Sequence, residues 1–392
     1  MARIFDEDLK LSLATRAVHA GQRPDETSGA IMPPVYQTAT YVQEGIGKNK
    51  GFDYARARNP TRDTLERNIA ALEGARYGHA FSSGMAATDA ILKLFSRSDH
   101  IICGQNVYGG VYRLMALVFG PLGLDFSFVD TRKVEAIEEA ITPATKLIHL
   151  ETPTNPMMHL TDIQAVCDLT KSRNILISVD NTFATPCFQR PFELGADIVL
   201  HSTTKYLNGH SDLIGGILLT NSAELSEKFD FTQKSSGAVP SPWDAWLTIR
   251  GTKTLVLRMK RHDESGRRIA QWISEHPVVE RTYYPGLPTH EQHELACRQM
   301  SGFGGMISLE LGKPRRAEVM VETTKLFALA ESLGGVESII GHPASMTHAS
   351  VPKEMRESMG LTDSLVRLSV GVEDPDDLIA DLDRALNAAS KV

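Results

Sequence analysis

Short apolar runs alternate with helix-like stretches through the middle of the chain. The runs are HIICGQNVYGG, DFSFVD, KLIHLE, NILISVD, ADIVLHSTTKY and GGILLT, all between residues 100 and 220. Strands that alternate with helices are typical of a mostly parallel sheet covered by helices. The pattern therefore predicts an α/β fold, a three-layer α/β/α sandwich.

The segments before this region have a different character. The first 60 residues are irregular and rich in turn residues, Tyr and Arg, which predicts an extended N-terminal arm. In the next stretch, TRDTLERNIAALEG, Leu65, Ile69 and Leu72 follow helical spacing and Gly74 is a suitable terminator. A short amphipathic helix is expected there.

The end of the chain predicts a second, smaller α/β domain. RGTKTLVLRMKRHDESGRRIAQWISEH has a long helical pattern, GGMISLEL and SLVRLSVGVED are strand-like, and DPDDLIADLDRALNAA predicts a final helix. We expect three parts: the arm at 1–60, a large domain at 61–252 and a C-terminal domain at 253–392.

Composition excludes several classes of protein. The 392 residues carry a formal net charge of −7 without a long basic block, so nucleic acid is not an expected partner. No apolar segment approaches the length of a membrane span, and MARIFDEDLKLSLATRAVHAG lacks the features of a signal peptide. A folded, soluble and cytoplasmic protein is predicted.

The cysteines and histidines do not indicate a metal site. The four cysteines are scattered, so neither disulfides nor structural zinc are expected. In HEQHEL the second histidine follows the first by three residues, whereas the metalloprotease motif requires four.

Unusual polar residues follow several of the predicted strands. Asp180 ends ILISVD, Asn155 lies in the loop after KLIHLE, Lys205 follows DIVLHSTT, and Tyr108 follows HIICGQNV. Ligands of open α/β sheets bind outside the carboxyl ends of the strands, so these groups are expected to converge in one crevice. A lysine, a carboxylate, an amide and an aromatic ring together suit pyridoxal 5'-phosphate, whose aldehyde, ring nitrogen and ring face need such partners.

Donors for the phosphate are also present. In SSGMAATDAILKLF, Ser83, Gly84 and Met85 begin an apolar-periodic helix, whose N-terminus favours an anion. Ser202 and Thr204 add hydroxyls beside the lysine. Each feature has an ordinary alternative, such as a surface lysine, a capping aspartate or a plain helix start. The joint placement carries the prediction.

Nine ordered segments resemble one family. The chain is similar to the Cys/Met-metabolism pyridoxal-phosphate enzymes from about residue 15 to the last helix. That resemblance implies the fold of PLP-dependent transferases (fold type I). The segments are YARARNPT, FSSGMAA, YGGVYR, ETPTNP, VDNTFATP, HSTTKYLNGHSD, AESLGGVES, MTHAS and VRLSVGVED.

The resemblance implies roles for the cofactor-binding residues. Lys205 would carry the cofactor and later shuttle protons, Asp180 would keep its ring nitrogen protonated, and Tyr108 would stack on the ring and assist proton transfer. The phosphate would be held by one subunit together with two arm residues of its neighbour: Gly84, Met85, Ser202, Thr204, Tyr54 and Arg56. The active sites would thus be shared between subunits of a homotetramer, a dimer of dimers.

The resemblance also implies a substrate, a small sulfur amino acid. Arg367 would clamp its α-carboxylate, oriented by Asn155 and Ser332. Glu331 matches the acidic residue of the γ-lyase and γ-synthase branches, where it can face the distal ammonium of cystathionine. Arg113, also assigned to substrate binding, and the absence of a cysteine after Tyr108 disfavour methionine γ-lyase.

Several activities stay open. GAVPSPWDAWLTIRGTKTL and YYPGLPTHEQHELACRQMSGFGGM most resemble cystathionine γ-lyases, which release cysteine, 2-oxobutanoate and ammonia. Cystathionine γ-synthase, which joins an acyl-homoserine to cysteine, is the alternative, followed by cystathionine β-lyase and methionine γ-lyase. From other classes, an aminotransferase and a non-catalytic cofactor-binding protein also share parts of this pattern.

Overall fold

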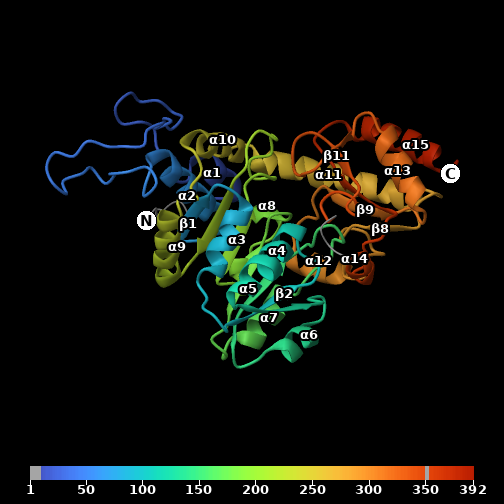
Figure 1. Cartoon of the computed structure of the whole chain (residues 1–392). Coiled ribbons are helices and arrows are strands. Elements are labelled where there is room, and N and C mark those ends of the chain that lie inside the picture. Colours follow the sequence, from blue (N-terminus) through green and yellow to red (C-terminus); the bar gives the residue numbers. More distant parts are fainter. Residues whose placement is uncertain (1–9, 349–352) are drawn as a thin grey trace. The chain divides into compact units, whose positions relative to one another are not determined.

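The protein is described by a computed structural model over residues 10–348 and 353–392 (Figure 1). It forms two compact units, each made of two segments. The first unit comprises the chain up to Ser96 and Arg190–Val256; the second comprises Arg97–Gln189 and Leu257–Val392. The division expected at residues 60 and 252 stays a prediction. The first three residues of the MTHAS segment are described, and the last two lie outside the described residues.

Helices surround three strands in the first unit. The strands are β1 (Tyr77–Phe81), β7 (Gly216–Thr220) and β6 (Ile198–Ser202), in that order. The helices are α1 (Leu13–His19), α2 (Pro60–Glu73), α3 (Gly84–Leu92), the 3-10 helix η3 (Pro191–Leu194), α9 (Ala223–Ser236) and α10 (Pro242–Thr252).

Strand β7 is antiparallel, which is compatible with the mostly parallel pairing that was expected. It runs antiparallel to both β1 and β6. A parallel partner needs a long crossover, usually a helix, whereas residues 203–215 form turns directly between β6 and β7. The predicted runs at β6 and β7 are strands as expected, but the sequence analysis missed β1, whose YGHAF lacks a clear apolar run.

Helix α2 confirms the expected amphipathic helix. Its N-cap is Asn59, whose side chain accepts hydrogen bonds from the backbone N–H groups of Thr61 and Arg62. It ends at Gly74, which adopts the left-handed conformation with φ 79°. Leu65, Ile69 and Leu72 are all buried.

The segment between α1 and α2 consists of long loops that reach away from these two helices (Figure 1, blue). A single bridge joins Thr40 to Tyr54 among the described pairings outside the strands. Ile31, Val42 and Ile46 on these loops are almost fully exposed. Apolar side chains in this state are suited to contact with another molecule.

The first segment of the second unit contains four parallel strands. Their order is β5 (Leu176–Asp180), β4 (Thr145–Glu151), β2 (His100–Gly104) and β3 (Asp125–Val129), which confirms the four apolar runs and their parallel pairing. The helices of this segment are α4 (Gly109–Arg113), the π-helix η2 (Leu114–Phe119), α5 (Gly120–Leu122), α6 (Val134–Ala140), α7 (Ile163–Thr170) and α8 (Thr185–Phe188).

The second segment contains a five-stranded sheet, and two of its strands are the runs expected near the C-terminus. Its order is β10 (Ala328–Leu329), β11 (Ile339–Gly341), β12 (Leu365–Ser369), β9 (Met306–Glu310) and β8 (Arg281–Tyr283). Helices α13 (Pro314–Thr323) and α15 (Pro375–Ala389) pack side by side (Figure 1). The remaining helices are α11 (Leu255–Ser274), α12 (His293–Gln299) and α14 (Lys353–Ser358).

An apolar core fills this segment, with Ile307, Leu368 and Leu382 among its fully buried members. The core explains why the final helix keeps an apolar face. Within residues 10–348 and 353–392, no helix is long and apolar enough to cross a membrane.

Candidate active site

Lys205 lies in the turn that follows β6 in the first unit. Its backbone N–H donates to the carbonyl of Ser202 at 3.2 Å, and its own carbonyl accepts from the N–H of Gly209 at 2.8 Å. The side chain is half-buried. The turn therefore fixes the backbone of Lys205 at the carboxyl end of the strand.

The start of α3 packs tightly against the two strands of the same unit. Ser83 is its N-cap, and its hydroxyl accepts from the N–H of Ala86 at 3.0 Å. A Cβ atom on Gly84 would lie 3.0 Å from the Cβ of Ser202, and one on Gly216 would lie 2.3 Å from the carbonyl oxygen of Ser83. Since the first N–H groups of a helix have no acceptor within it, this end suits a phosphate.

The hydroxyl of Thr204 is engaged with Gly215. It donates to the carbonyl of Gly215 at 3.2 Å and accepts from the N–H of the same residue at 3.0 Å. A phosphate oxygen would therefore replace that carbonyl as the acceptor of the Thr204 proton. Ser202, with its Oγ 3.2 Å from the position of a Cβ on Gly84, lies beside the helix start.

The two arm residues are exposed. The guanidinium carbon of Arg56 lies 5.5 Å from the centre of the Tyr54 ring, and Arg56 Nη1 donates to the carbonyl of Lys234 at 2.5 Å. Tyr54 is 45% exposed. Their polar groups thus lie at the surface of the first unit.

Asp180 ends β5 in the second unit. Its Oδ1 accepts from the N–H of Thr182 at 3.0 Å, which is the turn contact that a strand-end aspartate often makes. In the register of the sheet, Asp180 lies opposite Glu151 of β4. Two carboxylates therefore occupy neighbouring strand ends.

Tyr108 precedes α4, and its backbone is held by the same glutamate. Its N–H donates to Oε2 of Glu151 at 2.9 Å. The side chain is 39% exposed, so the phenol ring is accessible to a ligand. Arg113, at the other end of α4, is also exposed.

Arg367 of β12 joins Asn155 and Ser332. Its Nη1 donates to Oδ1 of Asn155 at 2.9 Å, and its Nη2 donates to the carbonyl of Ser332 at 2.7 Å. Ser332 has φ 88°, an uncommon conformation for a residue other than glycine. Arg367 is buried, whereas the neighbouring Glu331 is exposed. The structure therefore brings the three expected carboxylate-binding residues together.

Sequence reasoning missed two buried residues of this cluster. Besides binding Tyr108, Glu151 accepts from the N–H of Asn155 at 2.9 Å through Oε1. Burial first, and Arg367 second, lower the pKa of His348 to about 4, while a hydrogen bond with the Asn155 backbone acts in the opposite direction. The signal for Glu151 was its place at a strand end, the same signal that identified Asp180.

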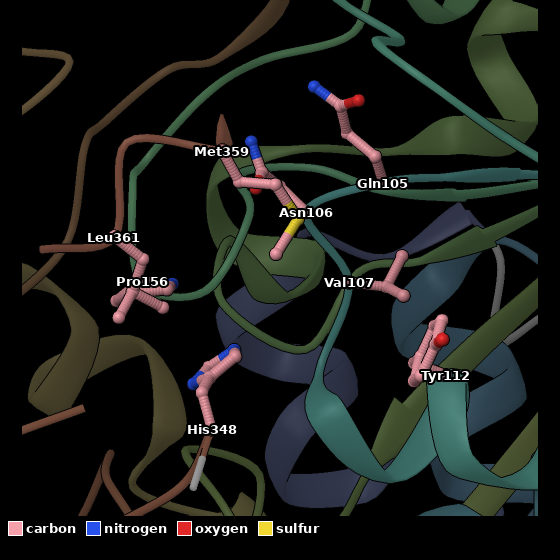
Figure 2. A pocket seen from close by; sticks show the side chains of 8 residues that line it. All are labelled: Gln105, Asn106, Val107, Tyr112, Pro156, His348, Met359 and Leu361. Atoms are coloured by element: carbon pink, nitrogen blue, oxygen red, sulfur yellow. The ribbon is translucent and has the colours of Figure 1, made fainter. Parts of the chain in front are cut away.

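A small cavity lies next to this cluster in the second unit. It measures about 10 Å³ and is lined by side chains that include Asn106, Pro156 and His348 (Figure 2). That is about the space one water needs, so the cavity cannot hold an amino-acid substrate as it stands. Among the residues that the structure describes, no cluster of three or more His, Cys, Asp or Glu side chains could hold a metal ion.

Comparison with known proteins agrees with this chemistry. The profile of the family described as Cys/Met metabolism PLP-dependent enzyme matches residues 14–387. A cystathionine gamma-synthase of Mycobacterium bovis is 51% identical over 95% of this chain and 96% of its own length. A cystathionine gamma-lyase of Bacillus subtilis is 50% identical over 95% of this chain and 98% of its own length. A cystathionine beta-lyase matches at 49% identity.

Solved structures share the fold. The structure of cystathionine gamma-lyase from Lactobacillus plantarum, complexed with L-serine, superposes with a TM-score of 0.95 at 46% identity, over 97% of this chain and all of that one. This confirms the predicted α/β fold of the family, and with it the dependence on pyridoxal phosphate. Each unit, taken by itself, has groups of a kind that suits this cofactor. The first has a lysine beside an anion-ready helix start, and the second has a strand-end carboxylate and an accessible aromatic ring. The chain belongs to the family of Cys/Met-metabolism enzymes that depend on pyridoxal phosphate.

Proposed function

We propose that the protein is a cystathionine γ-lyase, which cleaves L-cystathionine to L-cysteine, 2-oxobutanoate and ammonia by γ-elimination. The observation that carries the proposal is the contact of Arg367 with Ser332, directly after Glu331. A guanidinium suited to an α-carboxylate is thus held by the neighbour of an exposed acid. Cystathionine offers a carboxylate for the first group and a distal ammonium for the second.

Arg367 can hold a substrate while keeping its own contacts. A guanidinium has five N–H donors, and the bonds to Asn155 and Ser332 use two of them. Two parallel N–H groups of a guanidinium match the two oxygens of a carboxylate, and the amide of Asn155 limits how the guanidinium rotates. Arg113, on the exposed end of α4, is proposed to contribute a further cation to substrate binding.

Individual residues are proposed to serve the cofactor. When bound, pyridoxal phosphate supplies a sink for the electrons released at the substrate Cα. Lys205 is the proposed attachment point, and its Nζ then takes the Cα proton. Asp180 holds a proton on the ring nitrogen, and Tyr108 covers the ring. The phosphate is assigned to Gly84, Met85, Ser202 and Thr204.

The arm residues are proposed to act in a neighbouring subunit. Tyr54 and Arg56 carry exposed polar groups on a segment that also exposes large apolar side chains. Burying these apolar groups against a second copy would stabilise the assembly. We therefore propose a homotetramer built from dimers, in which the arm completes the phosphate site of its neighbour.

A cystathionine γ-synthase is the second candidate, since an enzyme with that name is 51% identical to this chain. It would remove an acyl group from an activated homoserine and add cysteine. The two activities share the carboxylate clamp and the proton transfers at Cα and Cβ. They differ in whether water or a thiol captures the product of elimination.

A paired assay separates the two candidates. The holoenzyme is given either cystathionine alone or acyl-homoserine plus cysteine, and both keto acid and cystathionine are quantified. We expect keto acid from cystathionine to form faster than cystathionine forms from the second pair. A far faster second reaction would make the protein a synthase.

Lys205→Ala is the matched control for this assay. It should abolish both reactions and remove the colour of the bound cofactor, since no amine remains to attach it. Coloured wild-type protein that releases no keto acid from any sulfur amino acid would instead favour a cofactor-binding protein without lyase activity.

A further inference from the structure

Glu151 occupies a position that joins two loops of the second unit. It is the last residue of β4, and only 6% of it is exposed. Its Oε2 accepts from the N–H of Tyr108, in the loop after β2, and its Oε1 accepts from the N–H of Asn155, in the loop after β4 itself. Both distances are 2.9 Å. One carboxylate therefore fixes the spacing between these two backbone segments.

Burial at this position disfavours the charged form of a carboxyl group. Burial, and then the neighbouring Asp180, raise the pKa of Glu151 to about 8, while the hydrogen bonds from Tyr108 and Asn155 oppose this rise. Each oxygen of a carboxyl group can accept one backbone N–H whether or not the group is protonated. A glutamine of the same shape has one acceptor oxygen and one NH₂ donor, so it could not accept from both backbone N–H groups. The carboxyl group is the side chain that satisfies both.

The contacts continue beyond Asn155. Its side-chain oxygen accepts from Arg367, which in turn donates to the carbonyl of Ser332. Hydrogen bonds therefore run without a break from the Tyr108 backbone through Glu151 and Asn155 to Arg367. If Asn155 shifted, the guanidinium of Arg367 that donates to it would change its orientation.

We propose that Glu151 is a positioning residue, which sets the distance between the ring-covering Tyr108 and the carboxylate-binding pair Asn155 and Arg367. The inference rests on the proposed function, because it concerns how the substrate carboxylate is held relative to the cofactor ring. Glu151 itself touches neither group; it acts through the two backbone N–H groups that it accepts. Small errors in such positioning reduce rates strongly when the chemistry depends on alignment.

The test is E151Q in the full-length holoenzyme. We expect the variant to retain bound cofactor, because Glu151 does not hold it. The KM for cystathionine should rise about 10-fold, since loss of one backbone contact releases Asn155 or Tyr108. The circular dichroism of the cofactor band should also change, because Tyr108 covers the ring.

Asp381 provides a matched control. It is also buried, and it also accepts backbone N–H bonds, from Lys325, Leu326 and Phe327, but it lies on α15. D381N should lower the thermal midpoint and leave KM and the cofactor band unchanged. If E151Q behaves like D381N, the role of Glu151 is structural and the proposal is wrong.

Two further measurements keep the proposal testable. If E151Q does not fold, E151D keeps the carboxyl group but is shorter by one methylene, so it cannot span both loops and should show the same rise in KM. Spectral titration with glycine measures carboxylate binding without turnover. If the wild-type protein is inactive both with cystathionine and with acyl-homoserine plus cysteine, the proposed function is wrong, but the role of Glu151 is not affected by that result. An unchanged glycine affinity and an unchanged cofactor band in E151Q would reject the role of Glu151.

Discussion

The guanidinium of Arg367 shows how much of the site depends on the geometry of single residues. Its two terminal nitrogens donate to different acceptors, the amide of Asn155 and the carbonyl of Ser332. A planar fork can make both contacts at once, and its geometry matches the two oxygens of a carboxylate. A lysine ammonium has the charge but lacks the fork.

Arg367→Lys should therefore weaken substrate binding more than cofactor binding. We expect KM for cystathionine to rise by about 10-fold or more, because the bidentate contact is lost and Asn155 loses its donor. Steady-state kinetics and the absorbance of the bound cofactor provide the two readouts. Arg315→Lys, at an exposed ion pair with Glu318, is the control and should change neither. Equal loss of cofactor and substrate binding in the Arg367 variant would contradict its assignment.

Asp180 and Lys205 can be proposed as site residues from the sequence alone, whereas Glu151 cannot. The first two follow apolar runs in which each strand end is visible in the sequence itself. Glu151 also ends a strand, but its importance depends on the N–H of Tyr108, which lies 43 positions earlier in the chain. A contact of this kind is set by the pairing of β4 with β2, which no local pattern reports.

Packing between β7 and α3 shapes the part of the first unit that is proposed to hold the phosphate. Gly216 faces the backbone of the helix start, where a Cβ atom would meet the carbonyl of Ser83 at 2.3 Å and the nitrogen of Gly84 at 2.7 Å. Backbone atoms cannot move aside as the end of a flexible side chain can. The glycine therefore permits α3 to begin where its N–H groups can serve an anion.

Gly216→Ala should push the start of α3 away from the strand. We expect a loss of cofactor affinity and a stability cost of about 1–3 kcal/mol, typical of overpacking. Equilibrium titration of the apoprotein with pyridoxal phosphate measures the first effect. Gly120→Ala is the control, because its Cβ would lie 3.5 Å from the nearest atom and alanine favours a helix. Unchanged cofactor affinity in the Gly216 variant would show that this packing does not support the phosphate site.

For the strands, the sequence predicts their positions better than it predicts whether neighbouring strands pair in parallel or antiparallel. The apolar runs at β2, β3, β4 and β5 are parallel strands, as expected, because helices or long crossovers connect them. The antiparallel direction of β7 follows from the turn that precedes it, and β1 was missed because glycine and histidine interrupt its apolar pattern. Buried His79 in β1 bonds Ser226 at 2.9 Å, a partner remote in sequence.

The pH dependence of stability is a property of the whole molecule. Burial is the main cause that lowers the pKa of six histidines: His79 to about 3, and His149, His159, His262, His290 and His348 to about 4. Each is protonated in the unfolded chain below about pH 6.5 but stays neutral in the folded protein. Folded stability is therefore lost as the pH falls from 6.5 towards 4.

Two buried carboxyl groups change the pH dependence of stability in the opposite direction. Burial raises the pKa of Glu66 to about 7 and that of Glu151 to about 8, above the value of about 4.3 in an unfolded chain. Their contribution is greatest at low pH and is lost as the pH rises towards 8. Because the histidines outnumber these two carboxyl groups, the net effect is that the free energy of unfolding falls in acid. Its maximum is expected near neutral pH.

His149→Asn tests this balance, because asparagine can keep the hydrogen bond that His149 Nδ1 makes with Ser178 and does not titrate. We expect the variant to lose about 2 kcal/mol less stability than wild type between pH 7 and pH 5, whatever the cost of the smaller side chain at pH 7. Denaturant midpoints at a series of pH values measure the difference in slope. His19→Asn, at an exposed position, should follow the wild-type profile. Parallel profiles for His149→Asn and wild type would mean that buried neutral histidines do not control the acid sensitivity of this fold.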